Sequence, residues 1–284
     1  MRATVVVPTR DRPADLARLM RTLAEQRTQG SFEVVLVDDG SEPPVAREAF
    51  DPELELRVLR RGGGGPAAAR NAGAAAARGG YLLFTDDDTE LAPTWVEAAC
   101  EFLDGNAAHV GVEGPVGSPP FDPLYEHSLE NDAPGAYWTC NIAYRREVFE
   151  RLGGFLENFP DPHCEDLDLA YRAEALGPIG FAQGMSVLHH PRPLPLRRWI
   201  GRARLTGSEA VLFARHRHRF GRSARMPARL FPVASALHNW GTQLRAQAPQ
   251  LVRSPRRLAR FFTVAALYIG TVLVTAARTP RKRR

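Results

Sequence analysis

Short apolar runs alternate with longer amphipathic segments through the first hundred residues. The runs are rich in β-branched residues, and the segments between them carry apolar residues at helical spacing, as at Leu16, Leu19, Met20 and Leu23. Strand–helix–strand repetition of this kind predicts an α/β fold built on a parallel, doubly wound sheet. We expect strands over residues 4–8, 32–41, 54–61 and 81–91, a helix over 11–26, and a glycine loop opening into an alanine-rich helix over 62–79.

The pattern becomes less regular after residue 110, where glycine and proline are frequent. A helical pattern returns over residues 164–177 and ends at Gly177, and a last strand is expected over 181–193. Residues 197–260 are predicted to form basic helices. They lead into an uncharged apolar run, 261–277, whose 17 residues are at the lower limit for crossing a bilayer. Positive charge on both sides of this run suits a helix lying in an anionic interface at least as well as a spanning one.

Polar side chains follow three of the predicted strands, where each strand ends. They occupy Thr9 to Asp11, Asp38 to Asp39 and Asp86 to Asp88. Ligands of doubly wound sheets bind outside the carboxyl ends of the strands. We therefore expect these three segments to meet at one rim and to form the functional site.

Charge divides the 284-residue chain into two parts. Residues 197–284 contain 20 Arg or Lys and a single acidic residue, Glu209, whereas residues 1–196 have an excess of 14 acidic side chains. We predict a catalytic domain over 1–196 and a basic helical extension over 197–284. The acidic part suits a cation, and the basic part suits anionic phospholipid head groups or nucleic acid. Nucleic acid is disfavoured, because aromatic residues are not interleaved as stacking platforms and 261–277 is too apolar.

The three cysteines, Cys100, Cys140 and Cys164, show no metal-binding spacing. Their odd number, and an N-terminus that opens with a strand pattern and not with a secretory signal, predict reduced thiols in a cytoplasmic protein.

Three adjacent carboxylates at Asp86 to Asp88 repel one another, and a divalent cation would neutralise them. Oxygen ligands suit Mg²⁺ or Mn²⁺, which in turn bind phosphates. The alternative is a solvated acidic turn. In the same way, the turn after Asp39 either contacts a base or ribose or is only an Asp-Gly turn, and the glycine loop before Arg70 either cradles phosphate or is merely flexible.

Glu165 and Asp166 stand at a predicted helix start, where carboxylates complement the helix dipole. The functional alternative is a general base that deprotonates an acceptor hydroxyl. His189 and His190 close the last predicted strand and are either structural or part of a metal site.

Five segments, in order along residues 3–196, resemble the inverting family-two glycosyltransferases of the GT-A fold. They are VVVPTRDRPADLARLMRTL, VVLVDDGS, AAARNAGAAAARGGYLLFTDDD, TCNIAYRREVFERLGGF and EDLDLAYRAEALG. The resemblance implies a mixed, mostly parallel sheet flanked by helices. It also implies transfer of a sugar from a nucleoside-diphosphate sugar with inversion, with Mn²⁺ or Mg²⁺ as cofactor.

The resemblance assigns the site residues one by one. It places the donor nucleotide against Pro8, Thr9 and Arg10, the base against Asp39, and the donor near Arg70. It matches Asp86 and Asp88 to the family's Asp-x-Asp motif, with Asp88 as the direct metal ligand and Asp86 as the second, and it places Asp86 and Asp87 on the donor side. It makes Asp166 the general base, with Glu165 as the alternative. It further implies acceptor-side positions at Trp138, Asn141, Gly153 and Gly154, and a histidine near the metal at His190 or, failing that, His189.

The long transport helices of processive synthases are missing, which favours transfer of one or a few sugars. The expected acceptor is a glycan or a lipid-linked molecule in cell-envelope polysaccharide or glycolipid synthesis, and the expected place is the inner face of the cell membrane. Two alternatives are a polyprenyl-phosphate sugar synthase and a catalytically inactive sugar-nucleotide-binding protein.

Overall fold

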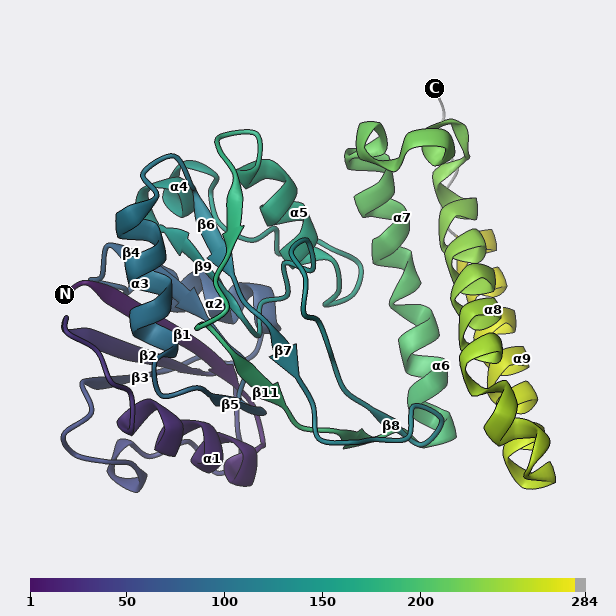
Figure 1. Cartoon of the computed structure of the whole chain (residues 1–284), viewed down its shortest axis with the longest axis horizontal. Coiled ribbons are helices and arrows are strands. Elements are labelled where there is room, and N and C mark those ends of the chain that lie inside the picture. The colour runs from purple at the N-terminus through teal and green to yellow at the C-terminus, as the bar shows by residue number, and fades with distance from the viewer. Residues whose placement is uncertain (279–284) are drawn as a thin grey trace. The chain divides into compact units, whose positions relative to one another are not determined.

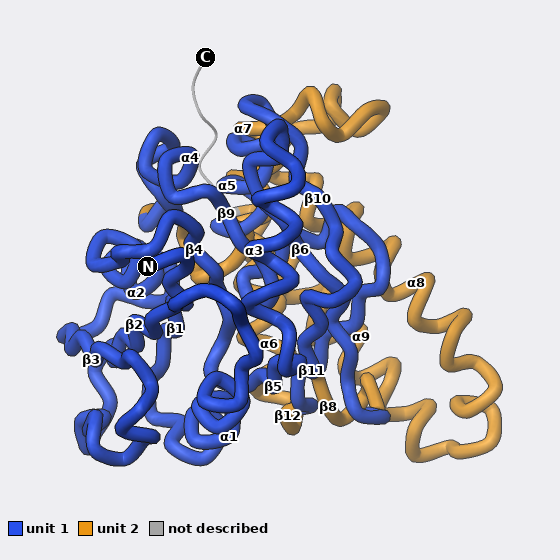
Figure 2. Tube along the Cα trace, turned by 60° about the vertical axis from the view of Figure 1, so that its left-hand side comes forward, with its two compact units in different colours: residues 1–121, 128–157, 165–191 blue, residues 122–127, 158–164, 192–284 orange. Residues whose placement is uncertain are grey.

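The computed structural model describes residues 1–278, which form two compact units. The first unit comprises residues 1–121, 128–157 and 165–191, and the second comprises residues 122–127, 158–164 and 192–284, of which 279–284 lie outside the described residues (Figure 2). The second unit thus includes three short segments from within residues 1–196, namely 122–127, 158–164 and 192–196. The assignment of catalysis to 1–196 and of membrane association to 197–284 stays a prediction.

A seven-stranded sheet forms the centre of the first unit, with strand order β10-β6-β9-β4-β1-β2-β3 (Figure 1). Strands β1, β2, β3 and β4 are parallel, β10 is parallel to β6, and β9 runs antiparallel to both β4 and β6. The predicted mixed, mostly parallel sheet is therefore confirmed. The strands are β1 Ala3–Thr9, β2 Phe32–Asp38, β3 Leu56–Arg60, β4 Tyr81–Phe84, β6 Gly111–Glu113, β9 Ile142–Arg145 and β10 Ile179–Phe181.

Helices cover both faces of this sheet. On one face, α1 and α3 pack on Val5 and Val7 of β1, and on the other, α2, α4 and α5 pack in the core that contains Val6. Successive strand residues point to opposite faces, so a strand buried on both sides needs an unbroken apolar run. This requirement explains the sequence of β1. The helices are α1 Pro13–Ala24, α2 Pro66–Ala75, α3 Trp95–Gly105, α4 Arg146–Arg151 and α5 Glu165–Ala173, and a short 3-10 turn covers Arg47–Ala49.

Gly73 lets α2 approach the sheet closely. A Cβ atom at this position would collide with Val6 and crowd Val37. The alanine-rich composition of α2 has the same cause, because small side chains allow the helix backbone to lie against β1 and β2. The start of α2 is thereby fixed over the carboxyl ends of these two strands.

Two of the predicted strands are each divided in the structure. The run 81–91 forms β4 and a separate β5 (Thr89–Leu91), and 181–193 contributes to β10, β11 (Val187–His189) and β12 (Arg192–Pro193). Strands β5, β11 and β7 (Val116–Gly117) form a small sheet in which His189 lies opposite Thr89. The division turns the acidic segment 86–88 away from the central sheet and brings β11 beside it.

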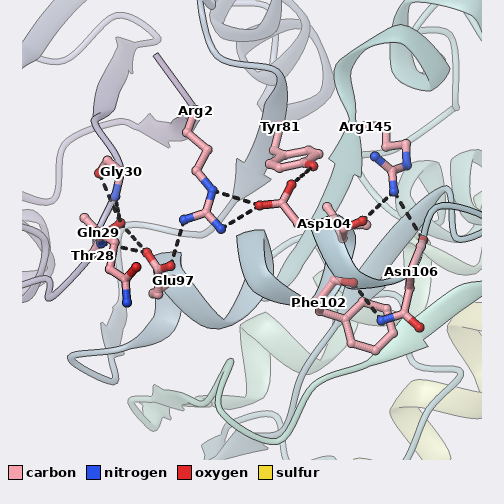
Figure 3. Close-up of polar contacts among 11 residues, drawn as sticks. Arg2, Thr28, Gln29, Gly30, Tyr81, Glu97, Phe102, Asp104, Asn106 and Arg145 are labelled. Atoms are coloured by element: carbon pink, nitrogen blue, oxygen red, sulfur yellow. Dashed lines mark hydrogen bonds and ion pairs between the residues drawn. The ribbon is translucent and has the colours of Figure 1, made fainter.

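An ion-pair network ties α3 to the amino ends of the strands (Figure 3). Arg2 contacts Glu97 at 2.7 Å and Asp104 at 2.7 Å, and Asp104 also accepts a hydrogen bond from the hydroxyl of Tyr81. Arg145 donates to the Leu103 carbonyl at the end of the same helix. These groups lie at the strand ends opposite the acidic segments, so we interpret the network as structural.

The second unit is largely helical, as predicted. Its helices α8 and α9 pack through Trp240 and Phe261, whose ring centroids are 5.2 Å apart, and α6 contributes Trp199. The apolar run 261–277 lies within α9, and residues 255–277 are long and apolar enough to cross a membrane by length and composition alone. The elements are α6 Leu196–Arg204, α7 Thr206–Arg215, 3-10 segments Arg217–Arg225 and Ala228–Leu230, α8 Phe231–Val252, α9 Pro255–Arg278, and β12 paired with β8 Glu126–His127.

Candidate functional site

The carboxyl ends of β1, β2 and β4 meet at one rim of the first unit. Thr9 pairs with Asp38 in the parallel register, and the Thr9 hydroxyl donates to Asp87 Oδ2 at 2.8 Å. The structure thus brings together the three strand ends that the sequence singled out. The rim is acidic and lies where doubly wound sheets hold their ligands.

Asp38 and Asp39 are adjacent but have different surroundings. Asp38 accepts hydrogen bonds from the backbone N–H groups of Ser41 and Val45 and pairs with Arg60 at 3.0 Å. Burial alone would raise the pKa of Asp38, but these donors hold it below its ordinary value. Asp38 therefore builds the turn that follows β2.

Asp39 instead contacts the glycine loop. Its Oδ2 accepts a hydrogen bond of 2.8 Å from the N–H of Gly65, which precedes α2 and has φ of 85°. Its Oδ1 lies 3.6 Å from Arg61 Nε and, within residues 1–278, accepts no hydrogen bond. A buried carboxylate oxygen without a donor is costly, so Oδ1 suits an N–H donor of a ligand.

Asp87 is turned into the protein. Besides Thr9 it contacts Arg12 Nη1 at 2.8 Å, and only 3% of the residue is exposed. Burial raises the pKa of Asp87 against the opposing effect of Arg12 and Thr9. Asp87 was expected among the donor-binding residues, and its contacts with Thr9 and Arg12 anchor the acidic segment to β1.

Arg70 bridges two carboxylates. Its Nη2 lies 2.7 Å from Asp86 Oδ1 and its Nη1 lies 3.2 Å from Glu165 Oε1, with 4% of the residue exposed. Burial would lower the pKa of Arg70, but the charges of Asp86 and Glu165 raise it, so the guanidinium stays ionised. The predicted donor-side arginine is thus occupied by the protein's own carboxylates, and it joins the end of β4 to the start of α5.

The two candidate histidines face different partners. His189 Nε2 lies 3.4 Å from Asp88 Oδ2, and His189 Nδ1 lies 3.1 Å from Ser128 Oγ. His190 contacts Glu90 at 2.8 Å through its Nε2 atom. The ring of His189, at the end of β11, thus faces Asp88, whereas the ring of the preferred candidate, His190, which follows the strand, contacts Glu90 instead.

Burial lowers the pKa of His189, which keeps its imidazole neutral, the form that binds metals. In residues 1–278 no three His, Cys, Asp or Glu side chains are grouped so as to hold a metal ion. Asp88 and His189 therefore form at most a partial ligand set, which phosphate oxygens of a ligand would have to complete.

The two carboxylates at the start of α5 are not equivalent. Glu165 is 6% exposed and ion-paired with Arg70, whereas Asp166 is half-buried and accepts a hydrogen bond of 2.8 Å from the Leu167 N–H. Of the pair, Asp166 is the more accessible to a ligand.

The predicted acceptor-side residues have mixed surroundings. Asn141 is 2% exposed and fully engaged, because it accepts from the Trp95 indole and donates to the carbonyls of Pro115 and Met185. Trp138 is half-buried. Gly153 and Gly154 have φ of 72° and 70°, which favours glycine, and the Gly154 carbonyl accepts a hydrogen bond from Arg172.

The first-strand residues line the rim in different ways. Pro8 is half-buried and Thr9 is buried, while the Arg10 side chain is 60% exposed beside Asp11.

Three residues that sequence reasoning missed complete the rim: Arg12, Asn71 and Ser128. Asn71 bonds both the N–H and the carbonyl of Phe155, and Arg12 and Ser128 hold Asp87 and His189. Arg12 and Asn71 stand inside quoted motifs, whereas Ser128 lies in the irregular region and carries no sequence signal.

A model of the family described as "Glycosyl transferase family 2" matches residues 4–177. The O-antigen biosynthesis protein RfbC of Myxococcus xanthus is 30% identical over 221 residues, which are 66% of this chain but only 17% of that protein. This chain therefore spans a small part of its relative's length.

Solved structures share the fold. The mannosyltransferase PcManGT from Pyrobaculum calidifontis, in complex with GDP-Man and Mn²⁺, has a TM-score of 0.63 at 19% identity, covering 99% of this chain and 88% of that one. S. aureus TarS has a TM-score of 0.56 at 19% identity, covering 100% of this chain and 56% of that one. TarS 1–349 in complex with UDP-GlcNAc has a TM-score of 0.55 at 18% identity and is covered to 93%. The expected GT-A fold is confirmed.

Proposed function

The chain belongs to glycosyl transferase family 2, and we propose that it moves a sugar from a nucleoside-diphosphate sugar to an acceptor hydroxyl with inversion. The observation that carries this proposal is the chain of contacts Asp86–Arg70–Glu165, which ties the acidic end of β4 to the start of α5, where Asp166 stands. This link supports the assignment of donor-side and acceptor-side carboxylates to one rim.

The donor nucleotide is assigned to the cradle made by Asp39, Pro8, Thr9 and Arg10. The Oδ1 atom of Asp39, which accepts no hydrogen bond within residues 1–278, suits an N–H donor on the base. Two structural neighbours are described as complexes with GDP-Man and with UDP-GlcNAc, which supports a nucleotide sugar as the donor class.

The metal is assigned to Asp88 and His189, with Asp86 beside them. A carboxylate oxygen and an imidazole nitrogen facing each other at 3.4 Å form a donor set that suits Mn²⁺ better than Mg²⁺. The PcManGT complex contains Mn²⁺, which is consistent with this choice. Such an ion, when bound, stabilises negative charge on the departing diphosphate.

Asp166 is assigned as the general base. It takes the proton of the acceptor hydroxyl while that oxygen bonds to the anomeric carbon and the bond from this carbon to the diphosphate oxygen breaks. Attack opposite the leaving group inverts the anomeric carbon. Glu165 is held by Arg70, so we assign it a positioning role.

The relative involved in O-antigen biosynthesis favours an envelope polysaccharide or glycolipid as the product, made on a glycan or lipid-linked acceptor. We place the protein at the cytoplasmic face of the membrane, with residues 197–284 against anionic lipid.

The experiment is a panel of nucleotide sugars, tested with the full chain for hydrolysis and thermal stabilisation, each with Mn²⁺, Mg²⁺ or a chelator. We expect one donor class to respond and the response to require the metal. Asp166→Asn should lower turnover by about 10²–10⁴-fold and keep donor binding. NMR of the product's anomeric configuration tests inversion. If neither a chelator nor Asp88→Ala changes the affinity for the donor, the metal-assisted proposal is excluded.

A further inference from the structure

Helix α9 has two apolar faces, and residues 1–278 cover one of them. Phe261, Val264, Val272 and Ala276 are buried, and they are distributed along the whole uncharged run. The other face is exposed, although water normally selects polar residues there. Its large members are Leu258 at 38% exposure, Phe262 at 53%, Leu267 at 39%, Leu273 at 51% and Val274 at 49%.

The threonines of α9 satisfy their own hydroxyl groups within the helix. Thr263, Thr271 and Thr275 donate to the carbonyls of Ala259, Leu267 and Thr271, at 2.8, 2.8 and 2.9 Å. No charged residue occurs between 261 and 277. The exposed face therefore needs no hydrogen bond from water, which is the condition for contact with hydrocarbon.

The covered face of α9 argues against a helix that crosses the bilayer. It packs on α6 and α8 within the second unit, through Ala203 and Ala236 around Val272 and through Trp240 around Phe261. Helices α6 and α8 expose charged and polar side chains, which do not enter a hydrocarbon core. These side chains are Arg197, Arg198 and Arg204 on α6 and Thr242, Gln243 and Arg245 on α8.

Positive charge lies directly beside the exposed apolar face. A groove of about 610 Å³ between α6 and α9 is lined by Ile200, Leu267 and Val274 among other apolar residues and threonines, and by one basic and one acidic side chain, Arg204 and Asp161. Arg253, between α8 and α9, and Arg256, in the first turn of α9, are both exposed. Apolar side chains next to guanidinium groups match the order of acyl chains and phosphates at the surface of an anionic bilayer.

We propose that the exposed face of α9 docks this protein on an anionic lipid bilayer, with α9 lying along the interface and not across it. This inference deepens the membrane location proposed above and rests on it. It does not depend on the assignment of the base or the metal.

The experiment is flotation of the full chain with vesicles of phosphatidylglycerol and phosphatidylcholine, compared with phosphatidylcholine alone. Phe262→Asp should lower the partition coefficient on anionic vesicles at least tenfold, and Leu273→Asp is the second variant in case the first does not fold. Leu237→Asp is the matched control, because Leu237 is 54% exposed on α8 beside polar neighbours, and its binding should stay within twofold of wild type. Donor hydrolysis should be unchanged in all three variants, which separates this test from that of the proposed chemistry.

Alkaline carbonate extraction of native membranes decides between the two orientations. Release of the wild-type chain supports the interfacial position, and retention overturns it. Equal loss of binding in Leu237→Asp overturns the choice of face. Light scattering tests whether a second copy of this chain covers the exposed face of α9. A dimer that Phe262→Asp dissociates, together with no binding of the wild-type chain to vesicles, also overturns the proposal.

Discussion

Removing the Arg70 guanidinium tests the link between the acidic end of β4 and the start of α5. In Arg70→Met, Asp86 and Glu165 lose their shared counter-ion, and the Glu165 side chain, 8% exposed, keeps an uncompensated charge. Breaking a buried ion pair by deleting one partner costs about 3–5 kcal/mol. The Asp86 side chain is 28% exposed and partly screened, so we expect about 3 kcal/mol, the lower end of that range.

The assay is urea unfolding of Arg70→Met, Glu165→Gln and the double variant. The double variant also removes the Glu165 charge that Arg70→Met leaves without its partner. Its loss of unfolding free energy should therefore be about 1–3 kcal/mol smaller than the sum of the two single losses. Arg70→Lys should be intermediate, because an ammonium lacks the planar fork that reaches both carboxylates.

Kinetics decide between a positioning arginine and a donor-binding one. A positioning role predicts a fall in kcat together with the loss of stability. An unchanged unfolding free energy combined with weaker donor binding would refute this reasoning. That result would instead indicate that Arg70 contacts the donor diphosphate directly.

Three further predictions concern single positions. His189→Ala should weaken Mn²⁺-dependent donor binding at least tenfold, whereas His190→Ala should leave it nearly unchanged; calorimetry with and without chelator checks this, and the reverse order would contradict the metal assignment. Because the pKa of Asp38 is lower in the folded state, its contribution to stability is present above its ordinary value of 3.8 and disappears as the pH falls through the folded-state pKa. Asp38→Asn should therefore unfold more easily at pH 7 and lose less stability between pH 5 and about pH 2 than wild type, and parallel curves would show that Asp38 is not responsible. Arg2→Met should lower the free energy of unfolding by about 1–3 kcal/mol with kcat unchanged, as measured by urea titration and donor turnover, since the Arg2 guanidinium contacts Glu97 and Asp104 at the strand ends opposite the acidic segments.

The central strands could be predicted from the sequence because the sheet is buried on both faces. A continuous apolar run such as that of β1 leaves few alternatives, and β1 and β2 lie within one to three residues of the predicted ranges. The divisions at 85–88 and 182–186 could not be predicted, because β5 is defined by pairing with β11, almost a hundred residues away. The local sequence of β5 does not indicate this distant partner strand.

The sequence indicated candidate site residues, but it did not indicate which side chains contact one another. The sequence marks Arg70 as a cation near carboxylates, yet only the packing of α2 on β1 shows that Asp86 and Glu165 neutralise it. The choice between His189 and His190 depends on the register of β11 on β5, since one residue of slip exchanges the two faces. Residues 122–127 join the helical unit through long-range contacts such as Asp122 with Arg257, which no local pattern indicates.

The attachment of helix α2 has a consequence for any redesign of the residues around it. Asp39 accepts a hydrogen bond from the N–H of Gly65 just before the helix. Arg70, five residues later, is ion-paired with Asp86 and Glu165. The helix is thus held at two points five residues apart, about 7.5 Å along its axis, one just before its start and one in its middle. A substitution of Asp39 therefore also loosens the start of α2, the helix that carries Arg70. The Arg10 side chain is 60% exposed and contacts Asp11, so substitutions there leave α2 in place.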